Sequence, residues 1–132
     1  MDLGHGWSLS GSYTYTDAHF RSGGFRGHDI SYIPHHMGRV ATNWRANERF
    51  NLYADMQYTG ERYASGDNAN ANPKVDSLTV FNVAVSYTWE EATLRLRVNN
   101  LLDEEYNGFE TTFGVYPAPK RNALVEVEWS FD

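Results

Sequence analysis

The chain has 132 residues, no cysteine and a formal net charge of −6, which excludes disulfides and cysteine-ligated metal sites. No cluster of Lys and Arg exists to neutralise phosphates, so nucleic acid is not an expected partner. Aromatic residues make up 15% of the chain although its mean hydropathy is −0.60, so apolar and polar residues must alternate closely, and no apolar run approaches the roughly 18 residues of a membrane helix.

Six segments alternate with a period of two, which predicts β-strands. In the first of them, every even position from Ser8 to Thr16 is Ser or Thr, while the odd positions begin with Trp7, Leu9 and Gly11. One face of each segment is therefore apolar and the other is polar or charged. The predicted strands cover residues 7–17, 38–45, 50–59, 77–89, 93–101 and 122–131.

The connections between these segments are of two kinds. Residues 46–49 and 90–91 form tight turns, whereas residues 18–34, 60–76 and 102–119 form long loops. In an up-and-down meander, the turns fall on one rim of the sheet and the loops on the other. This arrangement is typical of bacterial outer-membrane barrels, whose turns are periplasmic and whose loops are extracellular.

The tryptophans fit the same arrangement. Tracing the strands up and down places all four at the turn end of the apolar face, with Phe50 beside them, whereas Tyr15 and Tyr58 fall toward the loop end. Rings at these two levels suit the boundary between hydrocarbon and headgroups. The predicted membrane-interface girdle consists of Trp7, Trp44, Trp89, Trp129 and Phe131.

The polar face carries too much charge for a narrow, dry barrel interior, and six strands cannot close a barrel in lipid without leaving unpaired edges. We therefore expect an all-β, antiparallel meander that forms part of a transmembrane barrel with a wide or plugged lumen. Arg95 and Arg97 lie at similar heights to Glu126 and Glu128 on the next strand. Such cross-strand pairs stabilise a sheet by roughly 0.2–1 kcal/mol each.

Four short motifs resemble one known family. They are VNNLLDEEY at 98–106, YPAPKR at 116–121 before the last strand, IPHHMG at 33–38 and QYTGERY at 57–63. Together they resemble the C-terminal end of TonB-dependent outer-membrane receptors. The resemblance implies that residues 1–132 are the last strands of a barrel of about twenty-two strands, whose N-terminal plug is absent from this sequence.

The resemblance also implies a function. The chain would belong to a receptor in the outer membrane of a Gram-negative bacterium that imports a nutrient chelate, such as a ferric siderophore, haem or cobalamin. Its partners would be outer-membrane lipid, the remainder of the barrel and plug, and a TonB-type energy-coupling protein that acts through the plug. No cofactor and no enzymatic activity are expected, because no catalytic or phosphate-binding motif occurs.

The long loops offer candidate ligand-binding residues, because aromatic rings and guanidinium groups suit stacking and bidentate contact with an anionic chelate. The alternative is that these side chains only pack the loops against one another. The candidates are Phe20, Arg21, Phe25, Arg26, Tyr32, Tyr63, Phe109, Phe113 and Tyr116.

Histidines invite a metal hypothesis, since His19, His28, His35 and His36 gather with Asp29 around the first loop. Adjacent residues of a strand point to opposite faces, so His35 and His36 cannot easily share an ion, and we expect no metal site. Two other functions remain possible from the sequence. One is a soluble β-sandwich that binds carbohydrate and buries its tryptophans in one core, and the other is a small self-assembling outer-membrane pore.

Overall fold

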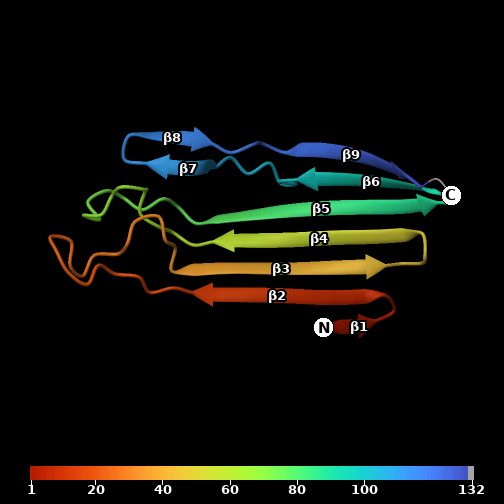
Figure 1. Ribbon diagram of the computed structural model, residues 1–132, viewed down its shortest axis with the longest axis horizontal. Coiled ribbons are helices and arrows are strands. Elements are labelled where there is room, and N and C mark those ends of the chain that lie inside the picture. The colour runs from red at the N-terminus through yellow and green to blue at the C-terminus, as the bar shows by residue number, and fades with distance from the viewer. Residues whose placement is uncertain (131–132) are drawn as a thin grey trace.

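The computed structural model describes residues 1–130, which form nine strands and no helix. The strands are β1 (Asp2–Gly4), β2 (Trp7–Tyr15), β3 (His36–Arg45), β4 (Phe50–Thr59), β5 (Leu78–Trp89), β6 (Ala92–Asn99), β7 (Asn107–Thr111), β8 (Gly114–Pro117) and β9 (Asn122–Trp129). Seven strands make one antiparallel sheet in the order β1-β2-β3-β4-β5-β6-β9, and β7 pairs with β8 in a separate hairpin (Figure 1).

Each of the six predicted strands is present, and their ends shift by a few residues. β6 stops at Asn99, two residues before the predicted end, because Asn100 adopts a φ of 51°. The side chain of Asn100 then accepts a hydrogen bond from Glu104 N (2.8 Å) and donates one to Glu104 O (2.8 Å). Asparagine tolerates this left-handed conformation better than most residues, so it ends the strand at low cost.

Three strands were not predicted. β1 turns back along β2 through Gly4, His5 and Gly6, all of which have positive φ angles. A side chain at Gly6 would place its Cβ 2.1 Å from Arg45 O, so this turn requires glycine. β7 and β8 form a hairpin inside the third predicted loop. Strands of three to five residues show too little alternation to be recognised in the sequence.

The sheet is a single layer without a hydrophobic core. Each strand contacts only its neighbours in the sheet, and Ala41 is the one buried hydrophobic residue of the described chain. The apolar face stays uncovered, with Trp89 60% and Trp129 54% exposed. The β-sandwich hypothesis is therefore wrong for the described residues, since it required a second layer and a core that buries the tryptophans.

Within residues 1–130 the sheet has two open edges, at β1 and β9, so the described strands do not close into a barrel by themselves. The expected fold class, an antiparallel meander of a partial barrel, is confirmed. Within residues 1–130 the structure contains no helix that is long and apolar enough to cross a membrane.

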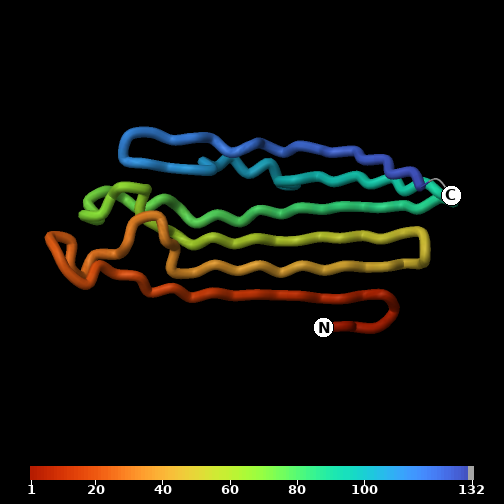
Figure 2. Tube along the Cα trace, viewed as in Figure 1, coloured from red at the N-terminus to blue at the C-terminus, as the bar shows by residue number. Residues whose placement is uncertain are grey.

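The short connections between strands of the seven-stranded sheet lie at one end of it and the long ones at the other, where the β7–β8 hairpin also lies (Figures 1 and 2). We call the end with residues 5–6, 46–49 and 90–91 the turn rim. The opposite end, the loop rim, carries the first loop (residues 16–35), the second loop (60–77) and the third loop (100–121, with β7 and β8).

Candidate functional site

The loop rim is an interlocked assembly, with the second loop at its centre. Asn70 of the second loop accepts a hydrogen bond from Asp29 N (2.7 Å) and donates one to Asp29 O (3.1 Å) in the first loop. Beside this pair, Ser31 Oγ donates to Asn68 Oδ1 (3.0 Å). The first and second loops are therefore held together by side chains that lie about forty residues apart in the sequence.

Asp67 shapes the second loop for these contacts. It is only 4% exposed, and its two carboxylate oxygens accept hydrogen bonds from Ala71 N and Asn72 N, both at 3.0 Å. These backbone donors favour the charged form and lower the pKa of Asp67 below its usual value. The carboxylate thus fixes the turn that presents Asn68 and Asn70 to the first loop.

The second and third loops are joined through their backbones. Ser65 and Thr111 form a parallel bridge, in which Ser65 N donates to Glu110 O (2.8 Å) and Thr112 N donates to Ser65 O (3.1 Å). This bridge adds the second loop to the edge of the β7–β8 hairpin. The hairpin is thereby fixed to the rest of the loop rim.

Tyr32 connects all three loops. Its backbone N donates to Tyr63 O (2.8 Å), its hydroxyl donates to Gly108 O (3.1 Å), and its ring meets Phe109 edge-on at 4.9 Å. The guanidinium carbon of Arg62 lies 5.1 Å from the centre of the same ring. Tyr32 has a φ of 68°, which is strained for a bulky residue, so these contacts must hold it in place.

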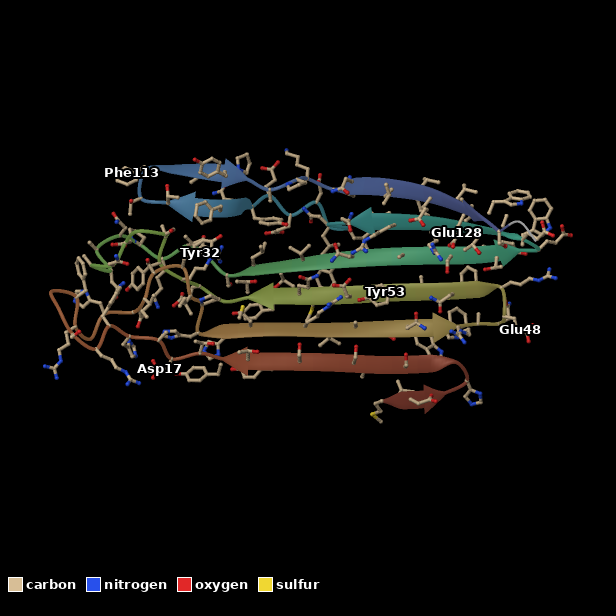
Figure 3. All side chains as sticks on the ribbon, in the orientation of Figure 1. Asp17, Tyr32, Glu48, Tyr53, Phe113 and Glu128 are labelled. Atoms are coloured by element: carbon tan, nitrogen blue, oxygen red, sulfur yellow. The ribbon has the colours of Figure 1, made fainter. Side chains whose placement is uncertain are left out.

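The predicted ligand-binding residues separate into two groups. Tyr32, Phe109 and Tyr116 pack against one another, with 6.0 Å between the rings of Phe109 and Tyr116, and so join loops. Phe113 is 99% exposed at the outer end of the hairpin, where Figure 3 shows it far from Glu48 of the turn rim.

The other ligand-binding candidates of the first loop lie near the tip of that loop. The rings of Phe20 and Phe25 are 5.9 Å apart, and Arg21 and Arg26 are exposed. Tyr63 of the second loop lies under the ammonium group of Lys74, 5.3 Å from its ring centre. The structure therefore brings some candidates together as loop packing, and no contact joins them all in one site.

Two histidines of the first loop, His19 and His35, lie beside carboxylates. Asp29 lies 3.0 Å from His19 Nδ1 and 3.5 Å from His35 Nε2, and His19 also contacts Asp17. His36 contacts Tyr13 instead, with 2.7 Å between its Nδ1 and the hydroxyl. No group of three or more His, Cys, Asp or Glu side chains in residues 1–130 is arranged to hold a metal ion.

The polar face of the sheet carries two charge clusters. Arg95 bridges Glu126 and Glu128, each at 2.9 Å, whereas Arg97 donates to Asn99 (2.7 Å) and not to a glutamate. On the central strands, Asp55 is 3% exposed, lies 3.6 Å from Arg39 and accepts from Gln57 and Asn82. Several charged and polar side chains on this face therefore pair with one another, although Asp55 Oδ2 and Asn51 Oδ1 are buried without a hydrogen-bond partner among the described residues.

The tryptophans of the predicted girdle lie at the turn rim. Trp7 pairs with Trp44 across β2 and β3, and their rings stack at 5.2 Å with 14° between the planes. Ala92 pairs with both Trp89 and Trp129, so these two rings belong to the same level of the apolar face. Phe131, the fifth predicted girdle residue, lies outside the described residues.

Sequence reasoning missed several residues of the loop rim. The sequence motifs and loop pattern indicate no role for three of them, Arg62, Asp67 and Asn70. A signal for one of them exists, because Asp67 precedes three asparagines within five residues, and Asp and Asn are typical of turns in which a side chain bonds nearby backbone groups.

Comparison with known families gives one match over most of the chain. The family described as "TonB dependent receptor-like, beta-barrel" matches residues 1–101. The chain is 34% identical over 101 residues to the "Iron-regulated outer membrane virulence protein" of Vibrio cholerae, which covers 75% of the chain and 16% of that protein. It is 32% identical over 135 residues to the "Ferrichrome outer membrane transporter/phage receptor" of Escherichia coli, with 94% of the chain and 18% of that protein covered.

Solved structures have the same fold. The siderophore receptor PiuA from Acinetobacter baumannii matches with a TM-score of 0.81 and 22% identity, covering 97% of this chain and 20% of that one. The ferric-catecholate import receptor Fiu from Escherichia coli matches with a TM-score of 0.76 and 20% identity, covering 98% and 19%. The chain thus spans about a fifth of these proteins or less.

The relatives are outer-membrane receptors and transporters of Gram-negative bacteria, which confirms the expected location and the expectation that the chain is not an enzyme.

Proposed function

This chain belongs to the family of TonB-dependent receptors, and from that premise we propose that it is the C-terminal barrel wall of a receptor that imports an iron chelate. Residues 1–132 would contribute the last strands of the barrel, and the remainder of the protein would contribute the other strands and the plug. A TonB-type protein would act through that plug. The resemblance seen in the sequence is confirmed at the level of the family.

The observation that carries the proposal is the two-faced, single-layer sheet. Its apolar face is uncovered, and its tryptophans gather at the turn rim, where lipid headgroups would meet them. Its polar face holds charged clusters such as Arg95 with Glu126 and Glu128, which suit a hydrated or plugged lumen. Such a sheet fits between lipid and a lumen, and fits poorly in water.

The printed names of two relatives, rather than the strands, support the proposed substrate class. The Vibrio protein is named as iron-regulated and the Escherichia protein as a ferrichrome transporter. We therefore favour a ferric siderophore over haem and cobalamin. The exposed aromatic and arginine side chains of the first loop, such as Phe25 and Arg26, would form part of its extracellular binding surface.

Uptake of radioactive iron tests the proposal. The full-length protein that contains these residues is expressed in an Escherichia coli strain that lacks its own ferric-siderophore receptors. Cells are then given iron-55 in one of three forms, namely a ferric siderophore, haem or uncomplexed iron. Parallel cultures are given cobalamin that carries radioactive cobalt. We expect accumulation of one siderophore class, and no accumulation when the energy-coupling TonB protein is deleted.

The competing pore hypothesis makes the opposite prediction. A self-assembling pore would admit small uncharged sugars at the same rate with and without the TonB protein, and the purified chain would run as heat-sensitive oligomers in detergent. Correct assembly is checked by the shift in gel mobility on heating. An assembled protein that admits sugars and accumulates no chelate would overturn the proposal.

A further inference from the structure

A pocket of about 370 Å³ lies between the second and third loops, above the start of β5. This volume is within the range of about 300–1,000 Å³ that is usual for small-molecule sites. Leu78 of the lining pairs with Thr59, two positions along the strands from the Val80–Gln57 pair, and so lies on the same face of the sheet as Gln57. The pocket therefore borders the polar face. The charged residues of the lining are Arg62, Lys74, Asp76, Glu104, Glu105 and Glu110.

Arg62 is the unusual member of this lining. It is only 8% exposed, and its Nη1 is buried without a hydrogen-bond partner among residues 1–130. The residue is held firmly, because its backbone exchanges hydrogen bonds with Val75 and its guanidinium group lies over Tyr32. A buried, unpaired guanidinium donor is costly, and its best partner is a carboxylate.

Most other charges around the pocket already have partners. Lys74 Nζ contacts Glu61 at 3.1 Å, and this hydrogen bond raises the pKa of Lys74, so the ammonium group stays charged. Glu105 is paired with Lys120, and Glu110 accepts from Asn107 at 2.8 Å. Within the described chain, the side chains of Asp76 and Glu104 form no ion pair or hydrogen bond.

The free groups are therefore one guanidinium donor and two carboxylates. A simple anion such as phosphate would satisfy Arg62, but the four carboxylates of the lining would repel it. A simple cation would suit Asp76 and Glu104 but would leave Arg62 Nη1 unpaired. A ligand that carries both charges on one small group satisfies all of them.

We infer that this pocket binds a zwitterionic amino-carboxylate group, with its carboxylate on Arg62 and its ammonium group facing Asp76 and Glu104. The chemical class is an amino acid or short peptide, either free or as the end group of a larger molecule. The inference goes beyond chelate uptake, because it concerns the pocket alone and is measured on purified protein without transport.

Equilibrium dialysis of the full-length protein in detergent tests the inference with three matched compounds. Glycylglycine carries both charges, N-acetylglycine lacks the ammonium group, and glycylglycinamide lacks the carboxylate. We expect glycylglycine to bind and each of the other two to bind at least about tenfold more weakly. Equal binding of the three, or no binding of glycylglycine, would overturn the inference.

Two variants assign the binding to this pocket. Arg62→Gln and Asp76→Asn should each weaken glycylglycine binding by about tenfold or more, and Arg49→Gln at the turn rim should leave it unchanged. Because Arg62 is buried and its replacement could disturb folding, the exposed Asp76 provides the second variant. Wild-type affinity in both pocket variants would contradict the assignment.

Competition then identifies the source of the group. If glycylglycine displaces the chelate found in the uptake experiment, the zwitterionic group belongs to that chelate. If both bind together, the pocket takes a second, separate ligand. Failure of glycylglycine binding with uptake intact would sink only this inference, whereas failure of uptake with binding intact would sink only the proposed function.

Discussion

The turn rim and the loop rim are built from contacts of different range. In the turn of residues 46–49, Asn47 Oδ1 accepts hydrogen bonds from Arg49 N (2.9 Å) and Phe50 N (2.8 Å), two and three residues away. At the loop rim, the hydroxyl of Tyr32 reaches Gly108, 76 residues away. The turn of residues 46–49 is therefore closed by its own side chain, and contacts along the turn rim, such as Arg45 N with Gly6 O (2.8 Å) and Thr88 N with Arg49 O (2.8 Å), join adjacent strands only. The loop rim is one structure made of three distant segments.

This difference predicts how damage spreads. A substitution at the turn rim should affect its own turn and the strands directly beside it, because the contacts there join adjacent strands only. A substitution at the loop rim should affect loops that are distant in the sequence. Each of the following substitutions tests whether this contrast is correct.

The largest effect is expected for Tyr32→Ala. The change removes an aromatic pair, a cation–π contact and a hydrogen bond, so the free energy of opening the loop rim should fall by about 2–3 kcal/mol. Hydrogen exchange should become faster in all three loops, including the amides of Arg62 and Thr112. The matched control is Phe113→Ala, since Phe113 is almost fully exposed and makes no loop contact to lose. Faster exchange confined to the first loop would break the comparison.

The next largest effect is expected from Asp67, whose charge should make the stability of the second loop depend on pH. Its pKa is lowered by the hydrogen bonds from Ala71 and Asn72, so the stabilisation is present above the unfolded value of about 3.9 and is lost as the pH falls through the folded pKa. The second loop should therefore release the first loop only below about pH 4. Hydrogen exchange at Ala71 and Asn72, corrected for the intrinsic rate, measures this. Asp67→Asn should abolish the pH dependence, and an unchanged profile in that variant would assign it to another group.

A smaller effect is expected at the turn rim for Asn47→Ala. The loss of two side-chain hydrogen bonds to exposed backbone groups should cost about 1 kcal/mol. Exchange should quicken at Arg49 and Phe50 while the loop rim keeps its wild-type rates. Changed exchange in any long loop would show that the two rims are coupled.

The smallest effect is expected for Arg95→Met on the polar face. Arg95 is half exposed and bridges two glutamates, so its removal should lower the stability to denaturant only slightly, and by less in high salt, which screens the ion pairs. Arg97→Met is the matched control, because Arg97 bonds Asn99 on its own strand. An equal loss in both variants would mean that the ion pairs add nothing.

The sequence by itself determined the wall of this protein. Period-two alternation predicts β2, β3, β4, β5, β6 and β9. The chain positions of Trp7 and Trp44 predict that both lie at one rim, where their rings stack. The same reasoning placed Arg95 near Glu126. These features follow from the sequence because in an antiparallel meander with short turns each residue's face and height depend only on its distance from the nearest turn.

Only the tertiary structure decided the loop rim. The sequence treated Tyr32 and Phe109 as ligand-binding candidates, whereas the structure packs them against each other, and it leaves a donor of Arg62 unpaired beside a pocket that no motif indicated. Long loops have no repeating pattern, and each backbone group there finds its partner among distant segments. Their conformation is therefore set by contacts such as Asn70 with Asp29 and Ser65 with Thr111, which form only when the strands have brought the loops together.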